Sequence, residues 1–484
     1  MPGPEDRTGK YLASVRNQPS LLLAFLRAMP KGADLHMHLS GAIYAENYIK
    51  WAAADGLCLH RPLLSYAPAP CDAEKGLVPA QQVLNDAGLY AQVINALSMR
   101  QFNGPESGHD HFFNTFGKFS AVSRTHQGDM LAEVASRAAM QNVSMLSLLL
   151  APDKGEAGRF PVSRQIAFAE DLPAMRTALL DAGIKDVVER SRKNLDQFES
   201  RMRDVLKCGT PESDAGCDVI IRYQFEIHRG LPPDVVFAEM LTGFELAASD
   251  PRVIDVNPVM PEDGFVEMRD FNLHMRMIDY LKSQYPGVRL SLHAGELWHG
   301  LVPLDGLRDH IRKSISLGHA ERIGHGVDVM FEDDPFGLIK EMAAKKIAVE
   351  INLSSNGQIL GVRGNDHPLP IYMKFGVPVV ISTDDEGVAR SGITNEYMIA
   401  LRNYDISYSQ LKKMVRDSLE YSFLPGESLW NGNKRLAACA KDSAGSKKVS
   451  AECQKALESS ERANAQWKLE QQFAKFEMEC CSVK

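Results

Sequence analysis

The sequence predicts an α/β fold, a closed (β/α)8 barrel with inserted loops and a helical C-terminal extension. From residue 34 onward, short apolar segments alternate with longer amphipathic ones, as in β-then-α units built on a parallel sheet. Close to eight such units follow one another, which favours a closed barrel over an open doubly wound sheet. No Gly-x-Gly-x-x-Gly motif follows the first predicted strand, so the pattern does not favour dinucleotide binding.

The predicted barrel strands are the apolar segments that lie between helical stretches. They cover residues 34–39, 143–150, 219–227, 252–258, 288–293, 321–324, 347–352 and 377–382. Helical periodicity predicts barrel helices over residues 127–141, 170–206, 232–249, 267–284, 303–317, 335–345 and 367–375. Before the second strand we expect helices over residues 11–29, 44–55 and 81–97, and the aromatic cluster 109–119 is interpreted as the packing face of a helix.

We expect the chain to divide into three parts. Residues 1–30 form an N-terminal helical lead-in, and residues 31–425 form the barrel with a Pro-rich insertion near 56–115. Residues 426–484 form a C-terminal extension in which 454–479 is one long polar helix packed on the barrel.

Composition limits the classes of partner. The 484 residues are 44% hydrophobic and 24% charged, which suffices for a large globular core. The net charge of −8 and the pI near 6.0 give no sign of a nucleic-acid or membrane partner. No run of about 18 apolar residues is present, so the sequence predicts no membrane-spanning helix.

Six of the eight cysteines fall into three local couples, each bracketing a loop that contains Pro, Gly or Ser. The couples are Cys58 with Cys71, Cys208 with Cys217, and Cys439 with Cys453. Such couples favour disulfides, which require an oxidising compartment; chance spacing of free cytosolic thiols is the alternative. We therefore expect a periplasmic or secreted protein whose export signal is absent from this sequence, with the cytoplasm as the second choice.

The first predicted strand carries two histidines on one face. In a strand, alternate side chains point the same way, so His36 and His38 project together while Leu35 and Met37 face the opposite side. Two adjacent imidazoles suit two ligands of one metal ion. The alternative is a pair of hydrogen-bonded histidines in a half-buried strand.

Polar clusters also end three later strands. They are Ser291-Leu-His293-Ala-Gly-Glu296, Arg322-Ile-Gly-His325-Gly326 and Val380-Ile-Ser-Thr-Asp384-Asp385-Glu386. In a (β/α)8 barrel the C-terminal strand ends open onto one face, where catalytic groups gather. These clusters are therefore expected to meet the histidine pair.

The converging residues predict a hydrolytic zinc site. Three imidazoles and one carboxylate have the right hardness for Zn²⁺ and leave one position for a water whose pKa the metal would lower. These four ligands are His36, His38, His293 and Asp384. Glu296 and His325 are suitable acid and base groups, and Asp385 is placed to hydrogen-bond a substrate. Each also has a structural alternative, as a helix cap, a loop partner or part of a turn.

Taken together, the motifs resemble those of the adenosine deaminase family. The resemblance rests on His36-Met-His38-Leu-Ser-Gly41, on the three clusters above, and on two supporting blocks, Val349-Glu-Ile-Asn-Leu-Ser-Ser-Asn356 and Ser422-Phe-Leu-Pro425. The Cys-bracketed insertions and the cluster 109–119 are closer to the exported, growth-factor-related branch of the family.

The resemblance implies a TIM barrel with one Zn²⁺ per chain and a small purine nucleoside as substrate. Glu296 would protonate purine N1, His325 would deprotonate the zinc-bound water, and Asp385 would hydrogen-bond N7. Attack at C6 would convert adenosine to inosine and ammonia, and 2′-deoxyadenosine to 2′-deoxyinosine and ammonia. A polynucleotide substrate is disfavoured because the chain lacks the Pro-Cys-x-x-Cys motif of the nucleic-acid deaminases. A homodimer is left open.

Three departures from the family pattern concern the substrate. Ser40 stands where adenosine-specific members carry an acidic residue facing the ribose, Met260 where a Gly lies beside the purine, and Glu386 where a Pro follows the Asp pair. Deamination of adenine or of a modified adenine nucleoside is therefore an alternative. A non-catalytic adenosine-binding protein is a further alternative, which the intact Glu296 and His325 oppose.

Overall fold

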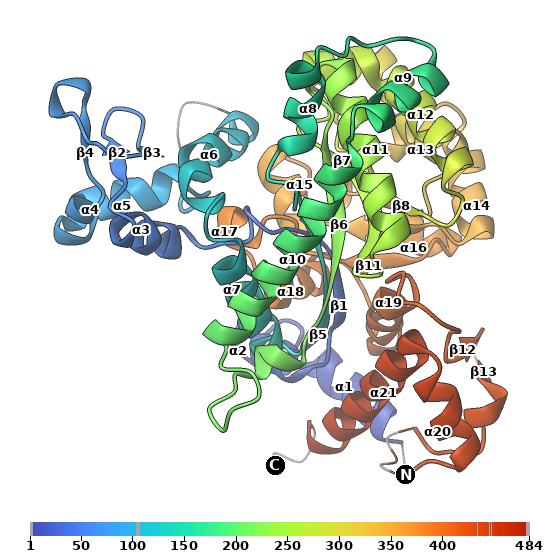
Figure 1. Ribbon diagram of the computed structural model, residues 1–484. Coiled ribbons are helices and arrows are strands. Elements are labelled where there is room, and N and C mark those ends of the chain that lie inside the picture. Colours follow the sequence, from blue (N-terminus) through green and yellow to red (C-terminus); the bar gives the residue numbers. More distant parts are fainter. Residues whose placement is uncertain (1–2, 103–106, 433, 445, 447, 481–484) are drawn as a thin grey trace.

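The computed structural model describes residues 3–102, 107–432, 434–444, 446 and 448–480; the other residues of the predicted lead-in, insertion and extension lie outside this description. Parallel strands form one eight-stranded sheet in the order β1-β5-β6-β7-β8-β9-β10-β11 (Figure 1). Their bounds are β1 Gly32–His38, β5 Val143–Leu150, β6 Ile220–His228, β7 Val253–Val259, β8 Arg289–Ala294, β9 Arg322–His325, β10 Ala348–Ile351 and β11 Val379–Ile381. A parallel bridge between Met37 and Asp384 joins the two outer strands and closes the sheet. The predicted (β/α)8 barrel is confirmed.

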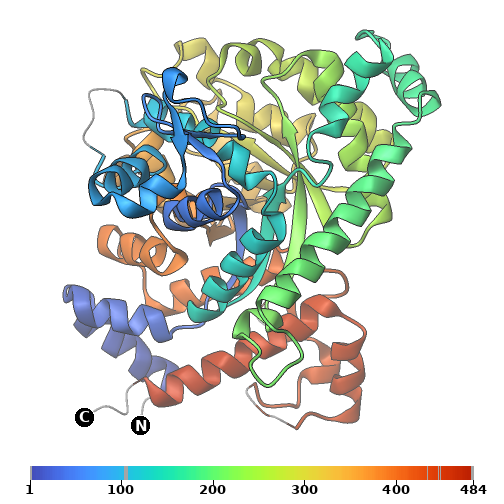
Figure 2. The ribbon, with the colours of Figure 1, turned by 60° about the vertical axis from the view of Figure 1, so that its left-hand side comes forward.

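Helices that follow the individual strands pack around the barrel (Figures 1 and 2). They include α7 Gln127–Met140, α8 Glu156–Arg164, α11 Pro233–Ser249, α12 Phe265–Gln284, α14 Pro335–Lys345, α15 Leu353–Ile359, α16 Leu369–Phe375, α17 Glu386–Ala389, α18 Ile393–Asn403 and α19 Tyr408–Glu420. Strands covered in this way are buried on both faces, which explains why β5 is an almost unbroken apolar run. In the described part of the chain, no helix is both long and apolar enough to cross a membrane.

Five predicted helices are each interrupted. The segment 11–29 is α1 Pro4–Val15 and α2 Pro19–Ala28, 81–97 is α4 Gln81–Asn85 and α5 Ala87–Ala96, 170–206 is α9 Leu172–Asp181 and α10 Lys185–Val205, 303–317 is a 3-10 turn followed by α13 His310–Ser316, and 454–479 lies in α20 Ala451–Glu458 and α21 Glu461–Glu479. The interruptions have local causes. Pro19 occupies the first turn of a new helix, Gly183 has a φ of +94°, and Ser460 caps α21 by accepting from the Ala463 N–H.

The insertion stands beside one end of the barrel (Figure 2). Its elements are α3 Ala45–Ala54, a small antiparallel sheet of β2 Cys58–His60, β3 Ser65–Ala67 and β4 Leu77–Pro79, and helices α4 Gln81–Asn85, α5 Ala87–Ala96 and α6 Gly108–Ser123. Helix α6 lies against α15, so closely that a Cβ on Gly108 would be 2.2 Å from the Gln358 carbonyl oxygen. This contact brings α6 over the C-terminal strand ends.

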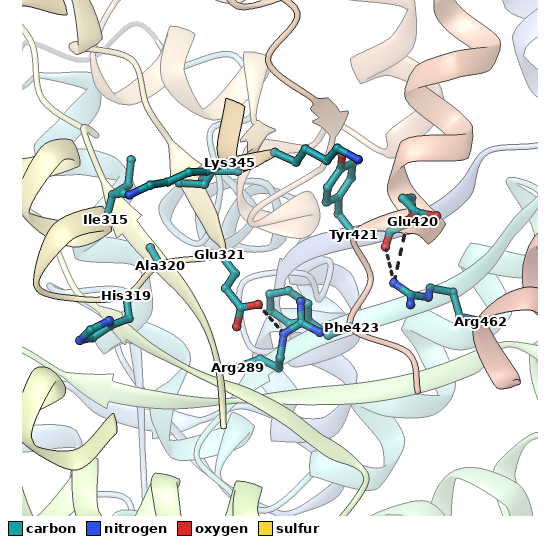
Figure 3. A pocket seen from close by; sticks show the side chains of 12 residues that line it. Arg289, Ile315, His319, Ala320, Glu321, Lys345, Glu420, Tyr421, Phe423 and Arg462 are labelled. Atoms are coloured by element: carbon teal, nitrogen blue, oxygen red, sulfur yellow. Dashed lines mark hydrogen bonds and ion pairs between the residues drawn. The ribbon is translucent and has the colours of Figure 1, made fainter. Parts of the chain in front are cut away.

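The C-terminal extension lies near the opposite strand ends, with α21 against α1 and α19 (Figure 1). Figure 3 shows a pocket of about 350 Å³ there, lined by residues of the strand starts and of the segment after α19. Arg289 pairs with Glu321 at 2.7 Å and lies 4.1 Å from the Phe423 ring centre, and Arg462 of α21 reaches Glu420 at 4.0 Å. These contacts connect the extension to the barrel.

Three disulfides close the three predicted cysteine couples, Cys58–Cys71, Cys208–Cys217 and Cys439–Cys453. Forming each disulfide removes two hydrogen atoms. The non-reduced protein is therefore expected to be lighter than the reduced chain by two hydrogen atoms per bond. Intact mass spectrometry before and after reduction checks this. Thiol alkylation of these six cysteines in denatured, non-reduced protein would contradict it.

Candidate active site

Three strands bring the four proposed metal ligands to one point. His36 and His38 share the inward face of β1, His293 lies near the end of β8, and Asp384 follows β11. One ligand atom from each lies within 4.8 Å of all the others. The His38 and His293 Nε2 atoms are 3.1 Å apart, and Asp384 Oδ1 is 3.5 Å from Nε2 of both His36 and His38.

Barrel closure itself positions Asp384. The His38 N–H donates to the Asp384 carbonyl at 2.9 Å, and the Asp384 N–H donates to the His36 carbonyl at 2.8 Å. Asp384 has a φ of +61° and His325 a φ of +73°, in the left-handed region that non-glycine residues seldom adopt. Such backbone strain is typical of sites where surrounding structure dictates side-chain direction.

Each ligand imidazole has an acceptor at its other nitrogen. Nδ1 of His36 lies 2.7 Å from Glu350, Nδ1 of His38 lies 3.0 Å from Glu226, and Nδ1 of His293 lies 2.8 Å from the Asn257 amide oxygen. These contacts favour the tautomer that leaves every Nε2 available as a metal ligand. Ser355 likewise donates to Asp384 Oδ2 at 2.6 Å.

The cluster fits a divalent cation. Within the described structure, the buried Nε2 of His36 has no hydrogen-bond partner. Burial lowers the pKa of His36, but the neighbouring carboxylates of Asp384 and Glu350 outweigh it and raise the pKa to about 10. Burial acts to raise the pKa of Asp384, yet His36 above all holds it well below its usual range. The buried carboxylates thus favour positive charge here, and three imidazoles with one carboxylate match zinc.

Glu296 and His325 lie beside this cluster with opposite pKa shifts. Glu296 Oε1 is 3.6 Å from His325 Nδ1, and His325 Nε2 is 3.9 Å from Asp384 Oδ2. Burial, then the charge of Asp384, raises the pKa of Glu296 well above its usual value, so Glu296 holds a proton. Burial lowers the pKa of His325 to about 3, so its imidazole is neutral. A protonated acid and a neutral base lie side by side.

Asp385 is fixed by the loop that follows β1. A Cβ on Gly41 would lie only 1.6 Å from Asp385 Oδ1, so this approach requires glycine. Burial, followed by the charge of Asp384, raises the pKa of Asp385 well above normal. Its Oδ1 is buried without a hydrogen-bond partner in the described structure. A protonated Asp385 can donate to a bound molecule.

A cavity of about 370 Å³ opens onto these groups. Its lining includes every predicted site residue except His36, which is fully buried behind it. The lining residues are His38, Ser40, Phe112, Phe113, Phe116, Glu226, His228, Val259, Met260, Pro261, His293, Glu296, His325, Ile359, Asp384 and Asp385. The interpretation of residues 109–119 as core packing was incomplete, because α6 packs Phe119 inward and also forms an aromatic wall of the cavity.

The three departures occupy different places. Ser40 lines the cavity, and its carbonyl accepts from the Tyr48 hydroxyl at 2.7 Å. Met260 also lines it, 37% exposed, with a φ of +84° that favours glycine and a carbonyl held by Arg229 at 2.9 Å. Glu386 does not line the cavity but is buried and paired with Arg137 at 2.9 Å. Of these three residues, only Ser40 and Met260 can touch a ligand in the cavity.

Sequence reasoning missed the residues behind and beside the ligands. These are Glu226, His228, Asn257 and Glu350. One signal was present in β6, where Gln224, Glu226 and His228 alternate with apolar residues and so share a face.

Comparisons with known proteins point to one enzyme family. The family profile described as Adenosine deaminase matches residues 261–431. The adenosine deaminase of Clostridium perfringens (strain SM101) is 32% identical over 401 residues, which cover 82% of this chain and 95% of that enzyme. The Vibrio atlanticus adenosine deaminase is 30% identical over 142 residues, 29% of this chain and 40% of its own length.

Among solved structures, Arabidopsis ADAL complexed with GMP has the same fold, with a TM-score of 0.56 and 18% identity over 83% of this chain and 94% of that one. The fold and the near full-length relative lead to one conclusion. The chain belongs to the adenosine deaminase family.

Proposed function

We propose that this protein hydrolyses adenosine to inosine and ammonia, and 2′-deoxyadenosine to 2′-deoxyinosine and ammonia. The observation that carries the proposal is the position of Glu296 and His325, 3.6 Å apart, beside a four-ligand cluster at the inner end of a cavity. Hydrolytic deamination needs a proton donor to the ring, a base for the attacking water and a means of acidifying that water. The three requirements meet here.

We propose that the resident metal is one Zn²⁺ per chain, held by His36, His38, His293 and Asp384. When bound, zinc lowers the pKa of a coordinated water toward neutrality. The choice of zinc rests on the nitrogen-rich ligand set and on the buried, unpartnered Nε2 of His36.

The protein side chains then have distinct tasks. Glu296 gives its proton to purine N1, which draws electron density away from C6. His325 accepts a proton from the water whose oxygen adds to C6. The C6 amino group takes up a proton and leaves as ammonia, so that adenosine and water give inosine and ammonia. Asp385, which holds a proton, donates to N7 and fixes the orientation of the purine ring.

Ser40 and Met260 favour a second candidate, an adenine or modified adenine nucleoside. Ser40 is a neutral partner for a sugar, and the half-exposed Met260 occupies space beside the expected base position. Both residues change substrate fit and leave the acid, the base and the ligand set untouched. A non-catalytic adenosine-binding role is opposed by the presence of both Glu296 and His325.

The decisive test combines metal analysis with a substrate panel. Zinc-loaded protein is expected to lower the ultraviolet absorbance of adenosine as inosine forms, to contain one zinc per chain, and to lose activity when a chelator removes the metal. Adenine and N6-substituted adenosines complete the panel. No turnover of any of these by protein with full zinc content would remove the proposed function.

We also propose that the protein works in the periplasm or outside the cell. The three disulfides support this, because such bonds persist in oxidising compartments. Fractionation of the producing cells, with the disulfide-bonded form followed by mass, tests the proposal. Recovery only from the cytoplasm would overturn it.

A further inference from the structure

Strand β6 carries an acidic side chain into the cavity that the proposed reaction does not use. Alternate residues of β6 face inward, and the deeper Gln224 is fully buried and bonded to Ser147 inside the barrel. Glu226 lies two residues further along, level with Asn257 of β7. It therefore reaches the cavity wall directly beside the metal-ligand layer.

Among the described residues, only one carboxylate oxygen of Glu226 has a hydrogen-bond partner. Oε1 lies 3.0 Å from Nδ1 of His38. Among the described residues, none hydrogen-bonds the other oxygen, Oε2, and 16% of the side chain is exposed. An acceptor oxygen thus faces the space where a ligand would sit.

The charge around this oxygen suits an uncharged donor. No Lys or Arg belongs to the cavity lining in the described structure. The cationic group there is His228, whose pKa burial lowers but Glu239 raises to about 9, and which already pairs with Glu239 at 3.2 Å. A hydroxyl can donate to Glu226, whereas a phosphate would meet a negative charge with no unpaired cation to offset it.

We propose that Glu226 determines specificity by accepting a hydrogen bond from a sugar hydroxyl of the nucleoside and by rejecting 5′-phosphorylated nucleosides. Ser40 lines the same cavity but is neutral, so Glu226 supplies the carboxylate that position 40 lacks. This inference rests on the proposed function, because it names the substrate class of the same site. Glu226 would act through contact with substrate in addition to orienting His38.

The test crosses one variant with a set of substrates. Wild type and Glu226→Gln are assayed with adenosine, with its 2′-, 3′- and 5′-deoxy analogues, and with AMP, and kcat and KM are measured separately. For adenosine, kcat/KM is expected to fall about 10- to 100-fold, because a hydrogen bond to a charged group is lost. The analogue that lacks the bonded hydroxyl should lose much less, and turnover of AMP relative to adenosine should rise.

Glu350→Gln is the matched control, because Glu350 supports His36 in the same way but does not line the cavity. Any decrease in kcat/KM in Glu350→Gln should be the same for all substrates. An equal loss across the deoxy analogues in Glu226→Gln would reduce Glu226 to a positioning residue and overturn the proposal. Wild-type turnover of AMP as efficient as that of adenosine would also overturn it.

Calorimetric binding of the same compounds to zinc-loaded protein separates this inference from the proposed function. If the wild type binds adenosine without deaminating it, the proposed reaction fails while the role of Glu226 is still measured. Binding that is unchanged in Glu226→Gln for every compound would overturn this inference and leave the proposed function intact.

Discussion

Glu296→Gln is expected to lower kcat for adenosine by about 100- to 10,000-fold, the range that a general acid contributes, while the zinc content stays at one per chain. The amide keeps the size of the carboxyl group and can still hydrogen-bond, but it has no proton to transfer to N1. Zinc is retained because Glu296 does not belong to the four-ligand cluster. Steady-state absorbance assays and elemental analysis on the same samples measure both quantities.

Glu226→Gln provides the comparison for this variant, since both residues are carboxyl groups that line one cavity. A lost proton donor should impair adenosine and every deoxy analogue to the same degree, whereas a lost hydroxyl acceptor should not. Unchanged turnover in Glu296→Gln would remove Glu296 as the acid. Loss of zinc in that variant would instead make Glu296 part of the metal site.

The meeting of the ligand residues could be predicted from sequence because it depends on one rule of the fold. In a parallel barrel every strand ends on the same face, so polar residues that end apolar strands must meet there. His36, His38, His293 and Asp384 all lie at such ends. The bridge between Met37 and Asp384 closes the barrel and fixes the position of Asp384 beside β1. The number of β-α units in the sequence does not predict this pairing.

The supporting residues could not be predicted in the same way, because their roles depend on register between strands distant in sequence. Glu350 of β10 meets His36 of β1 across the barrel interior, and Asn257 of β7 meets His293 of β8. From sequence alone, Glu350 is one acid in an apolar strand. The breaks between α9 and α10 and between α20 and α21 were not predicted. Each lies at a single residue, Gly183 or Ser460, and the apolar periodicity of the sequence continues across it.

Arg322→Ala is expected to destabilise the protein by about 3–5 kcal/mol, the typical loss when one partner of a buried ion pair is removed. Arg322 is fully buried inside the barrel. It donates to Glu350 at 2.5 Å, to Asp255 at 3.0 Å and to the Tyr421 carbonyl at 3.0 Å. The alanine variant leaves two buried carboxyl groups without their cation. Thermal unfolding of wild type and variant measures the loss.

Arg289→Ala is the matched control. Arg289 and Arg322 lie 4.1 and 4.0 Å from the Phe423 ring centre, but the side chain of Arg289 is 43% exposed and its ion pair with Glu321 is near the surface (Figure 3). Its loss should cost about 1 kcal/mol or less. Equal destabilisation by the two variants would assign the effect to the aromatic contact.

Arg322→Ala should also weaken metal binding, although Arg322 touches no ligand atom. Burial raises the pKa of Glu350, while Arg322 and then His36 lower it to about 2. Without Arg322 the Glu350 carboxyl gains a proton more readily and becomes a poorer acceptor for Nδ1 of His36. Lost outer contacts of this kind typically cost 10- to 100-fold in metal affinity. Zinc titration against a competing chelator should therefore show weaker binding in Arg322→Ala and unchanged binding in Arg289→Ala, which would tie the stability of the barrel interior to its metal site.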